Sequence, residues 1–168
     1  MKKLFFLIQV AFCIILIYSC QSYKPPQTYQ FDKSKVINKS YDEVWNKIIK
    51  WFGNNNTPIK TIEKASGLIS TDFNLSVDNI KNAMDCGVYK HNNNEIFVDY
   101  SGNFNIVVEK VNETSTRVTI NAFFFSFEGE AVSENIVSYK FVKTNKSKKI
   151  NCNSTGYLEK ELFDFIEK

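Results

Sequence analysis

Apolar side chains recur at helical spacing in two segments of the chain. In the first, SYDEVWNKIIKWFG at residues 40–53, the large apolar residues share one face of a helix: Tyr41, Val44, Trp45, Ile48, Trp51 and Phe52. Ser40 and Glu43 stand three residues apart at its start and can form a capping box. Gly53, followed by asparagines, suits the end of a helix. The pattern therefore predicts an amphipathic helix over this segment.

The second helical segment is CNSTGYLEKELFDFIEK, at the end of the sequence. Its apolar stripe consists of Leu158, Leu162, Phe165 and Ile166. Ser154 or Thr155 can cap this helix. A further short helix is expected near residues 77–84.

Between the two long helices, apolar and polar residues mostly alternate, as is typical of strands. The alternation predicts a hairpin and then a meander, over residues 59–73, 95–100, 103–111, 116–130 and 135–143. Ala65-Ser66-Gly67 supplies the turn of the hairpin, and Ser101-Gly102 is expected to break the strand pattern.

The order of these elements indicates the fold class. Consecutive strands with short turns favour an antiparallel sheet, and the two amphipathic helices must cover one of its faces. We expect an α+β fold over residues 31–168, with a curved antiparallel sheet and two amphipathic helices. This arrangement resembles a helix-grip fold.

The first twenty residues have a different pattern. Lys2 and Lys3 precede an apolar run that ends before Ser19-Cys20, which is typical of an export signal. The run is shorter than the roughly 20 apolar residues that span a bilayer. An uncleaved anchor with an incidental cysteine is the alternative.

Residues 17–20, Ile-Tyr-Ser-Cys, resemble the lipobox of bacterial lipoproteins. The resemblance implies that residues 1–19 are removed as a signal peptide and that Cys20 is acylated, so that the chain is anchored in lipid. Residues 20–30 contain two prolines and read as a tether. No acidic residue follows Cys20 directly, which by the same resemblance favours the outer membrane, with the protein facing the periplasm.

The charge of the chain gives little support to a nucleic-acid partner. The formal net charge is +3, and Lys2, Lys3 and Lys24 lie in the signal and tether, so the domain is close to neutral. The lysine-rich run at residues 143–149 has two interpretations. It is either a solvated connection between a strand and the last helix, or a contact with anionic lipid.

Two cysteines, Cys86 and Cys152, remain after the signal and the lipidated cysteine are set aside. In an oxidising compartment such a pair predicts a disulfide; two free thiols are the alternative. With the single histidine, His91, they do not make a familiar set of metal ligands. We expect neither a metal site nor a cofactor.

Catalytic motifs are absent from the sequence. It contains no G-x-G-x-x-G, no phosphate-binding loop, no H-E-x-x-H and no G-x-S-x-G. We therefore expect a protein that is not an enzyme.

Aromatic residues occupy both sides of one predicted strand. Phe123, Phe125 and Phe127 share one side, and the opposite side holds Val118, Ile120, Ala122 and Phe124. In a sheet with one solvent-exposed face, apolar and polar residues should alternate strictly along each strand. The second apolar side is therefore covered by the chain itself, lines a cavity, or contacts a partner. Phe123, Phe125 and Phe127 are the candidate binding residues.

The helix bearing Val44-Trp45, followed by GLISTD at residues 67–72, is similar to the repeating unit of BamC-like outer-membrane lipoproteins. The resemblance covers residues 36–127 and implies a helix-grip fold. The chain differs from that family in its single domain and its expected disulfide. The function expected is a lipid-anchored module that binds another envelope protein. The alternative is a carrier that holds a lipid or another apolar ligand in its grip cavity.

Overall fold

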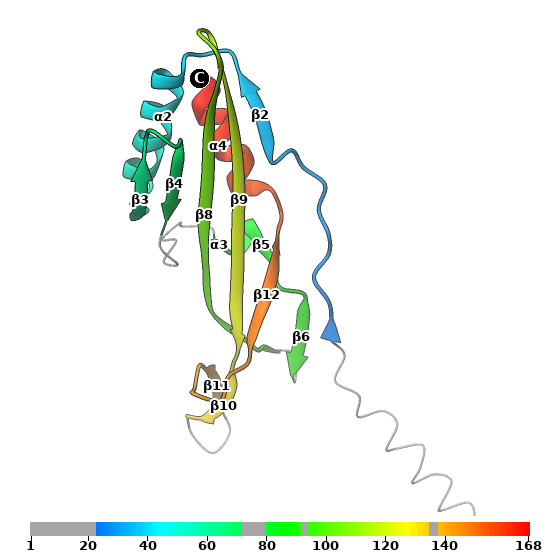
Figure 1. The fold of residues 1–168 in the computed structure, drawn as a ribbon. Coiled ribbons are helices and arrows are strands. Elements are labelled where there is room, and N and C mark those ends of the chain that lie inside the picture. Colours follow the sequence, from blue (N-terminus) through cyan, green and yellow to red (C-terminus); the bar gives the residue numbers. More distant parts are fainter. Residues whose placement is uncertain (1–22, 72–79, 92–93, 135–137) are drawn as a thin grey trace, which may run out of the picture.

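A computed structural model describes residues 23–71, 80–91, 94–134 and 138–168 of the 168-residue chain (Figure 1). It confirms the α+β class. One seven-stranded sheet has the order β3-β4-β8-β9-β12-β5, with β2 beside β9, and every pairing in it is antiparallel. Its strands are β2 (Ser34–Ile37), β3 (Ile59–Glu63), β4 (Leu68–Thr71), β5 (Met84–Asp85), β8 (Phe97–Asn112), β9 (Ser115–Glu128) and β12 (Lys149–Ser154).

Two helices lie against the same face of this sheet, as expected (Figure 1). Helix α2 (Tyr41–Asn54) is capped by Ser40, whose Oγ accepts a hydrogen bond from the backbone N–H of Glu43 at 3.4 Å. Helix α4 (Tyr157–Glu167) begins after Gly156, which adopts a left-handed conformation. The prediction that Ser154 or Thr155 is the N-cap of α4 is therefore wrong, because the N-cap is Gly156, which has no side chain to form a cap hydrogen bond.

Large side chains from both helices and from β4, β8 and β9 fill the space beneath the sheet. The rings of Trp51 and Phe52 lie 6.0 and 6.2 Å from the ring of Phe104. The fully buried apolar residues include Val44, Ile48, Ile69, Ile106, Val118, Ile120, Leu158, Leu162 and Ile166. The predicted apolar stripes of the two helices thus form the core, although Tyr41 and Phe165 are only partly buried.

The longest elements are β8, of 16 residues, and β9, of 14 residues, which pair along nearly their whole length. The expected break at Ser101-Gly102 is wrong. The pairing only shifts between Val98 and Ser101, beside Asp99 with its φ of 52°. A Cβ on Gly102 would lie 2.4 Å from the Phe124 ring, so this glycine permits close packing rather than a turn.

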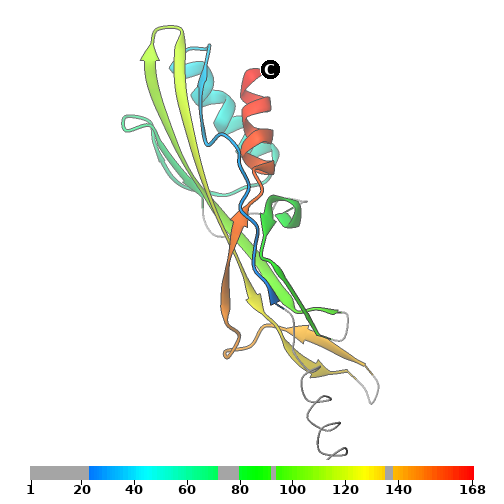
Figure 2. The same ribbon diagram turned by 90° about the vertical axis from the view of Figure 1, so that its right-hand side faces the viewer.

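Shorter elements lie beyond α2 and α4, with α3 (Ile80–Ala83) near mid-length of the long hairpin and the others toward the end opposite its 112–115 turn (Figure 1 and Figure 2). The others are β6 (Val88–His91), β7 (Asn94–Glu95), β10 (Glu130–Ser133) and β11 (Tyr139–Val142). Helix α3 is the described part of the short helix expected near residues 77–84, whose positions 77–79 lie outside the described residues. The last predicted strand corresponds to β11, with 135–137 also outside. Residues 143–149 were expected to lead directly into the C-terminal helix. They lead instead into β12, a strand that the sequence pattern missed.

The expected signal peptide, residues 1–19, and the expected lipidation site Cys20 lie outside the described residues. Within the described ranges, no helix has the length and apolar character needed to cross a membrane. Residues 23–30, expected to form a tether, run along the domain, and β1 (Tyr23–Lys24) pairs with β6.

Candidate functional site

The side of the sheet turned away from α2 and α4 is the candidate binding surface, here called the helix-free face. Because side chains alternate along a strand, β9 places Asn121, Phe123, Phe125 and Phe127 on this face, opposite its buried residues. The neighbouring strands add Asn103, Asn105, Lys149 and Asn151. Cross-strand pairs link Asn103 to Phe123, Asn105 to Asn121 and Asn151 to Phe125.

The three candidate phenylalanines differ in their surroundings. Phe123 is 53% exposed, whereas Phe125 and Phe127 are half-buried and pack edge to face with 5.8 Å between ring centroids. The Lys149 Nζ lies 3.8 Å from the centre of the Phe125 ring, and the Lys143 Nζ lies 3.7 Å from that of Phe127. The protein's own lysines thus cover two of the rings by cation–π contacts. Phe123 is the most exposed of the three.

A hollow of about 690 Å³ opens beside Phe123. Its lining includes Tyr29, Lys33, Asn103, Phe123, Lys149 and Asn151. The residues described around it include two lysines but no carboxylate. The hollow therefore combines an exposed aromatic ring, amide groups and positive charge, which together suit a polar ligand with some negative charge.

Asn103 provides the clearest unsatisfied group of this surface. Its Oδ1 is buried and has no hydrogen-bond partner among the described residues. An unpaired buried acceptor costs about 1–3 kcal/mol. The sequence offered no signal for this unpaired group, because the burial of the oxygen depends on tertiary packing.

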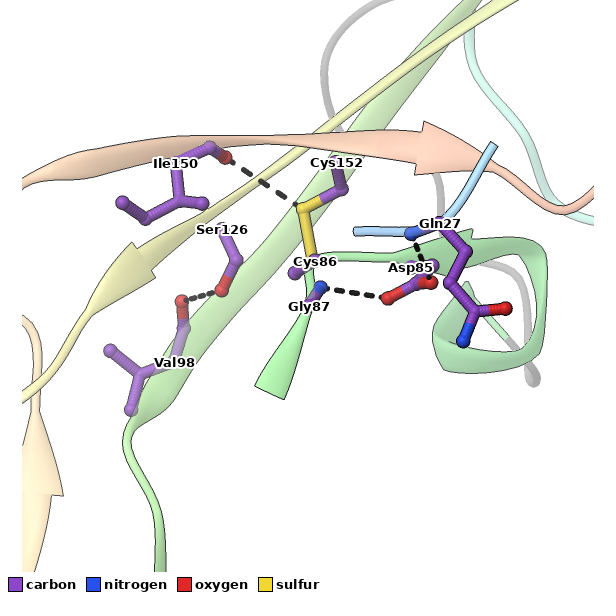
Figure 3. Close-up of a disulfide and its surroundings, with 8 residues drawn as sticks. All are labelled: Gln27, Asp85, Cys86, Gly87, Val98, Ser126, Ile150 and Cys152. Atoms are coloured by element: carbon purple, nitrogen blue, oxygen red, sulfur yellow. Dashed lines mark hydrogen bonds between the residues drawn. A yellow bond between two sulfur atoms is a disulfide. The ribbon is translucent and has the colours of Figure 1, made fainter. Parts of the chain in front are cut away.

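The predicted cysteine pair is present as a disulfide between Cys86 and Cys152 (Figure 3). Cys86 follows β5, and Cys152 lies in β12. Beside the disulfide, the Asp85 Oδ1 accepts a hydrogen bond from the Gly87 N–H at 2.7 Å. This cross-link ties the segment around Asp85 to the long hairpin through β12.

Glu159 is a buried ionisable group that sequence reasoning did not single out. It is 1% exposed, and its Oε1 accepts a hydrogen bond from the Ser154 hydroxyl at 2.7 Å. Burial raises the pKa of this carboxyl above its ordinary value, and the Ser154 hydrogen bond opposes the shift. Its Oε2 has no partner among the described residues.

The described residues were compared with the requirements of a metal site. No group of three or more His, Cys, Asp or Glu side chains among them could hold a metal ion. Glu159 stands on the first turn of α4, outside the lining of the 690 Å³ hollow.

Comparisons of the chain with protein-family models, with curated proteins and with solved structures found no match. The similarity to BamC-like lipoproteins thus stays a prediction from the sequence.

Proposed function

We propose that this protein is a lipid-anchored, non-enzymatic lipoprotein that binds another envelope protein through its helix-free face. The anchor is Cys20, and the location is the outer membrane, facing the periplasm. The single observation that carries the binding role is the exposed Phe123 ring beside a hollow lined by amide side chains and two lysines. An aromatic anchor surrounded by polar groups is a common centre of protein interfaces.

The carrier alternative has less support. A carrier needs room between sheet and helices for its ligand, and in this chain Trp51, Phe52 and Phe104 fill that space. The hollow beside Phe123 is open and carries lysines and amides, which suits a polar partner better than an acyl chain.

The binding role is tested with Phe123→Ser and a matched control, Tyr157→Ser. Tyr157 is also an exposed aromatic residue, 43% exposed, but it lies on α4 rather than on the helix-free face. Each variant is cross-linked in intact cells and purified, and its partners are identified by mass spectrometry. We expect Phe123→Ser to lose a protein partner that the wild type and Tyr157→Ser retain. A partner set unchanged by Phe123→Ser would contradict the proposal, and a co-purifying lipid would support the carrier.

The anchor is tested separately. We expect the Cys20→Ala variant to keep its signal segment and to take up no labelled fatty acid, because no thiol remains to be acylated. A variant that still incorporates the label would show that the anchor lies elsewhere.

A further inference from the structure

The segment of residues 23–33, here called the N-terminal strap, is bound along the domain. Its strand β1 pairs with β6, matching Tyr23 to Tyr89 and Lys24 to Val88. Further along, the Ile120 N–H donates to the Lys33 carbonyl at 2.8 Å. The strap is therefore held at both of its ends.

Asp85 holds the middle of the strap. Its Oδ2 accepts hydrogen bonds from the Gln27 N–H at 2.9 Å and from the Tyr29 hydroxyl at 3.1 Å. From the other side, the Asn153 Nδ2 donates to the Gln27 carbonyl at 2.8 Å. Figure 3 shows Gln27 and Asp85 next to the Cys86–Cys152 disulfide, which fixes the position of this carboxylate.

Gly87 allows the strap backbone to lie in direct contact with the backbone that follows Cys86. Its φ is +79°, and a Cβ there would lie 2.2 Å from the Lys24 carbonyl oxygen. Any other residue would meet the strap backbone and would also be strained at this φ. The local sequence Asp85-Cys86-Gly87 thus forms a dock for the strap: a hydrogen-bond acceptor, a cross-link and a residue without a side chain.

The strap determines which end of the domain is nearest to the anchor. Tyr23 and Lys24 lie beside β6, toward the end that carries β10 and β11 and away from the tip of the β8–β9 hairpin (Figures 1 and 2). Only residues 21–22 separate Tyr23 from the proposed lipidated Cys20, a reach of about 10 Å when extended. A free strap ending at Lys33 would instead reach more than about 40 Å.

The same end presents an ordered lysine loop, residues 143–149, in which four of the seven residues are lysines and none is acidic. The Thr144 N–H donates to the Ser147 Oγ at 2.9 Å, and the Ser147 N–H donates to the Thr144 carbonyl at 3.3 Å. Lys143 pairs with Asp99 at 3.4 Å. Lys146 and Lys148 are exposed and form no ion pair with any described residue.

We propose that the docked strap holds the end of the domain formed by β6, β10, β11 and the loop 143–149 against the bilayer surface, where Lys146 and Lys148 contact anionic lipid headgroups. This inference rests on the proposed lipid anchor. Each lysine that reaches an anionic surface contributes about a fivefold preference for the docked orientation, and the strap confines the domain within reach of that surface.

The orientation is tested with the full acylated protein in vesicles of phosphatidylethanolamine and phosphatidylglycerol that contain a lipid with a nitroxide headgroup. A fluorophore is attached to Asn145→Cys in one preparation and to Glu113→Cys, at the hairpin tip, in another. Both sites are exposed. We expect the nitroxide to quench the label at position 145 strongly and the label at position 113 hardly at all.

Two sets of variants separate the contribution of the two lysines to the docked orientation from that of the strap. Lys146→Gln/Lys148→Gln should reduce the ratio of docked to undocked protein by roughly 25-fold, and the matched pair Lys50→Gln/Lys60→Gln, on α2 and β3, should leave it unchanged. Asp85→Ala and, independently, Gly87→Ala should release the strap and weaken quenching at position 145. Vesicles of phosphatidylcholine alone should reproduce the effect of the lysine variants.

Each outcome bears on one proposal or on both. Equal quenching at positions 145 and 113 in acylated protein would overturn this inference and leave the anchor proposal standing. Quenching at position 145 that survives Asp85→Ala and Gly87→Ala, and also Lys146→Gln/Lys148→Gln, would overturn the roles of the strap and of the two lysines. An N-terminal peptide without acyl mass would overturn the anchor and this inference together.

Discussion

The two ends of the long β8–β9 hairpin are stabilised in different ways. At one end, α2 and α4 cover the sheet (Figure 1), and large rings such as Trp51 and Phe104 fill the space between them and the sheet. At the other end, beyond these two helices, the Cys86–Cys152 disulfide and lysine–aromatic pairs hold the strands. The helix-covered end is thus stabilised mainly by burial, whereas the other end adds a disulfide and cation–π contacts to the burial of residues such as Met84 and Phe97.

The largest effect is expected from the helix-covered end. Trp51 is 1% exposed and packs against the Phe52 and Phe104 rings. Trp51→Ala should lower the free energy of unfolding by about 3–5 kcal/mol, because it leaves a cavity in the core. Urea unfolding followed by far-UV circular dichroism measures this. A loss below about 1 kcal/mol would show that this end does not depend on its core.

Removal of the disulfide tests the other end. Cys86 and Cys152 are 66 residues apart in sequence, and Cys86→Ser/Cys152→Ser should cost about 2–4 kcal/mol. The loss of stability should appear first in the segment around the missing disulfide. Amide hydrogen exchange should accelerate at residues 84–88 while residues 104–108, beneath the helices, stay protected. Uniform acceleration along both segments would mean that the two ends unfold as one unit.

Glu159 lies where the ends meet, and it should make stability depend on pH. Its pKa is higher in the folded chain than the ordinary value of 4.5, because burial disfavours the carboxylate. The folded state therefore favours the protonated form. Its contribution to stability is complete below the ordinary pKa and is lost as the pH rises through the higher folded value.

Glu159→Gln should remove that dependence and raise stability at pH 7 by about 1 kcal/mol. Thermal unfolding between pH 4 and pH 8 measures the effect, with Glu161→Gln on the same helix as the control. A variant that is as pH-dependent as the wild type would contradict the assignment to Glu159.

The smallest effect on stability is expected on the helix-free face. Phe123→Ser should change the free energy of unfolding by less than about 0.5 kcal/mol, because the ring is 53% exposed. Phe125→Ser should cost more, since its half-buried ring packs against Phe127 and lies under Lys149. Urea unfolding of both variants separates them. A large loss from Phe123→Ser would mark that ring as core rather than binding surface.

Local patterns predicted the parts of the fold that local forces determine. Helix α2 follows from its apolar stripe and from the Ser40 cap, all within one segment. The alternation in β9 correctly assigned Val118, Ile120 and Phe124 to the buried side. The disulfide was predicted because only two cysteines remain after the signal segment and the proposed lipidated cysteine are set aside.

The errors arose where distant residues decide the structure. The polar strand β12 is a strand because it pairs with β9 and carries the disulfide. The polar, proline-containing residues 23–30 are docked because Asp85, 58 positions from Gln27, binds them. The unpaired Asn103 oxygen and the burial of Glu159 likewise depend on neighbours that no local pattern contains.

The length of the unbroken hairpin also sets the distance between its two ends. Strand β8 runs for 16 residues without a turn, or about 50 Å at roughly 3.3 Å per residue. Phe123 pairs with Asn103, six positions along from the Phe97 end of that strand, or about 20 Å. If the lysine-bearing end rests on the lipid, Phe123 lies roughly 20 Å above that end, and a partner bound to Phe123 is held at that distance. The helix-covered end lies farther from the lipid.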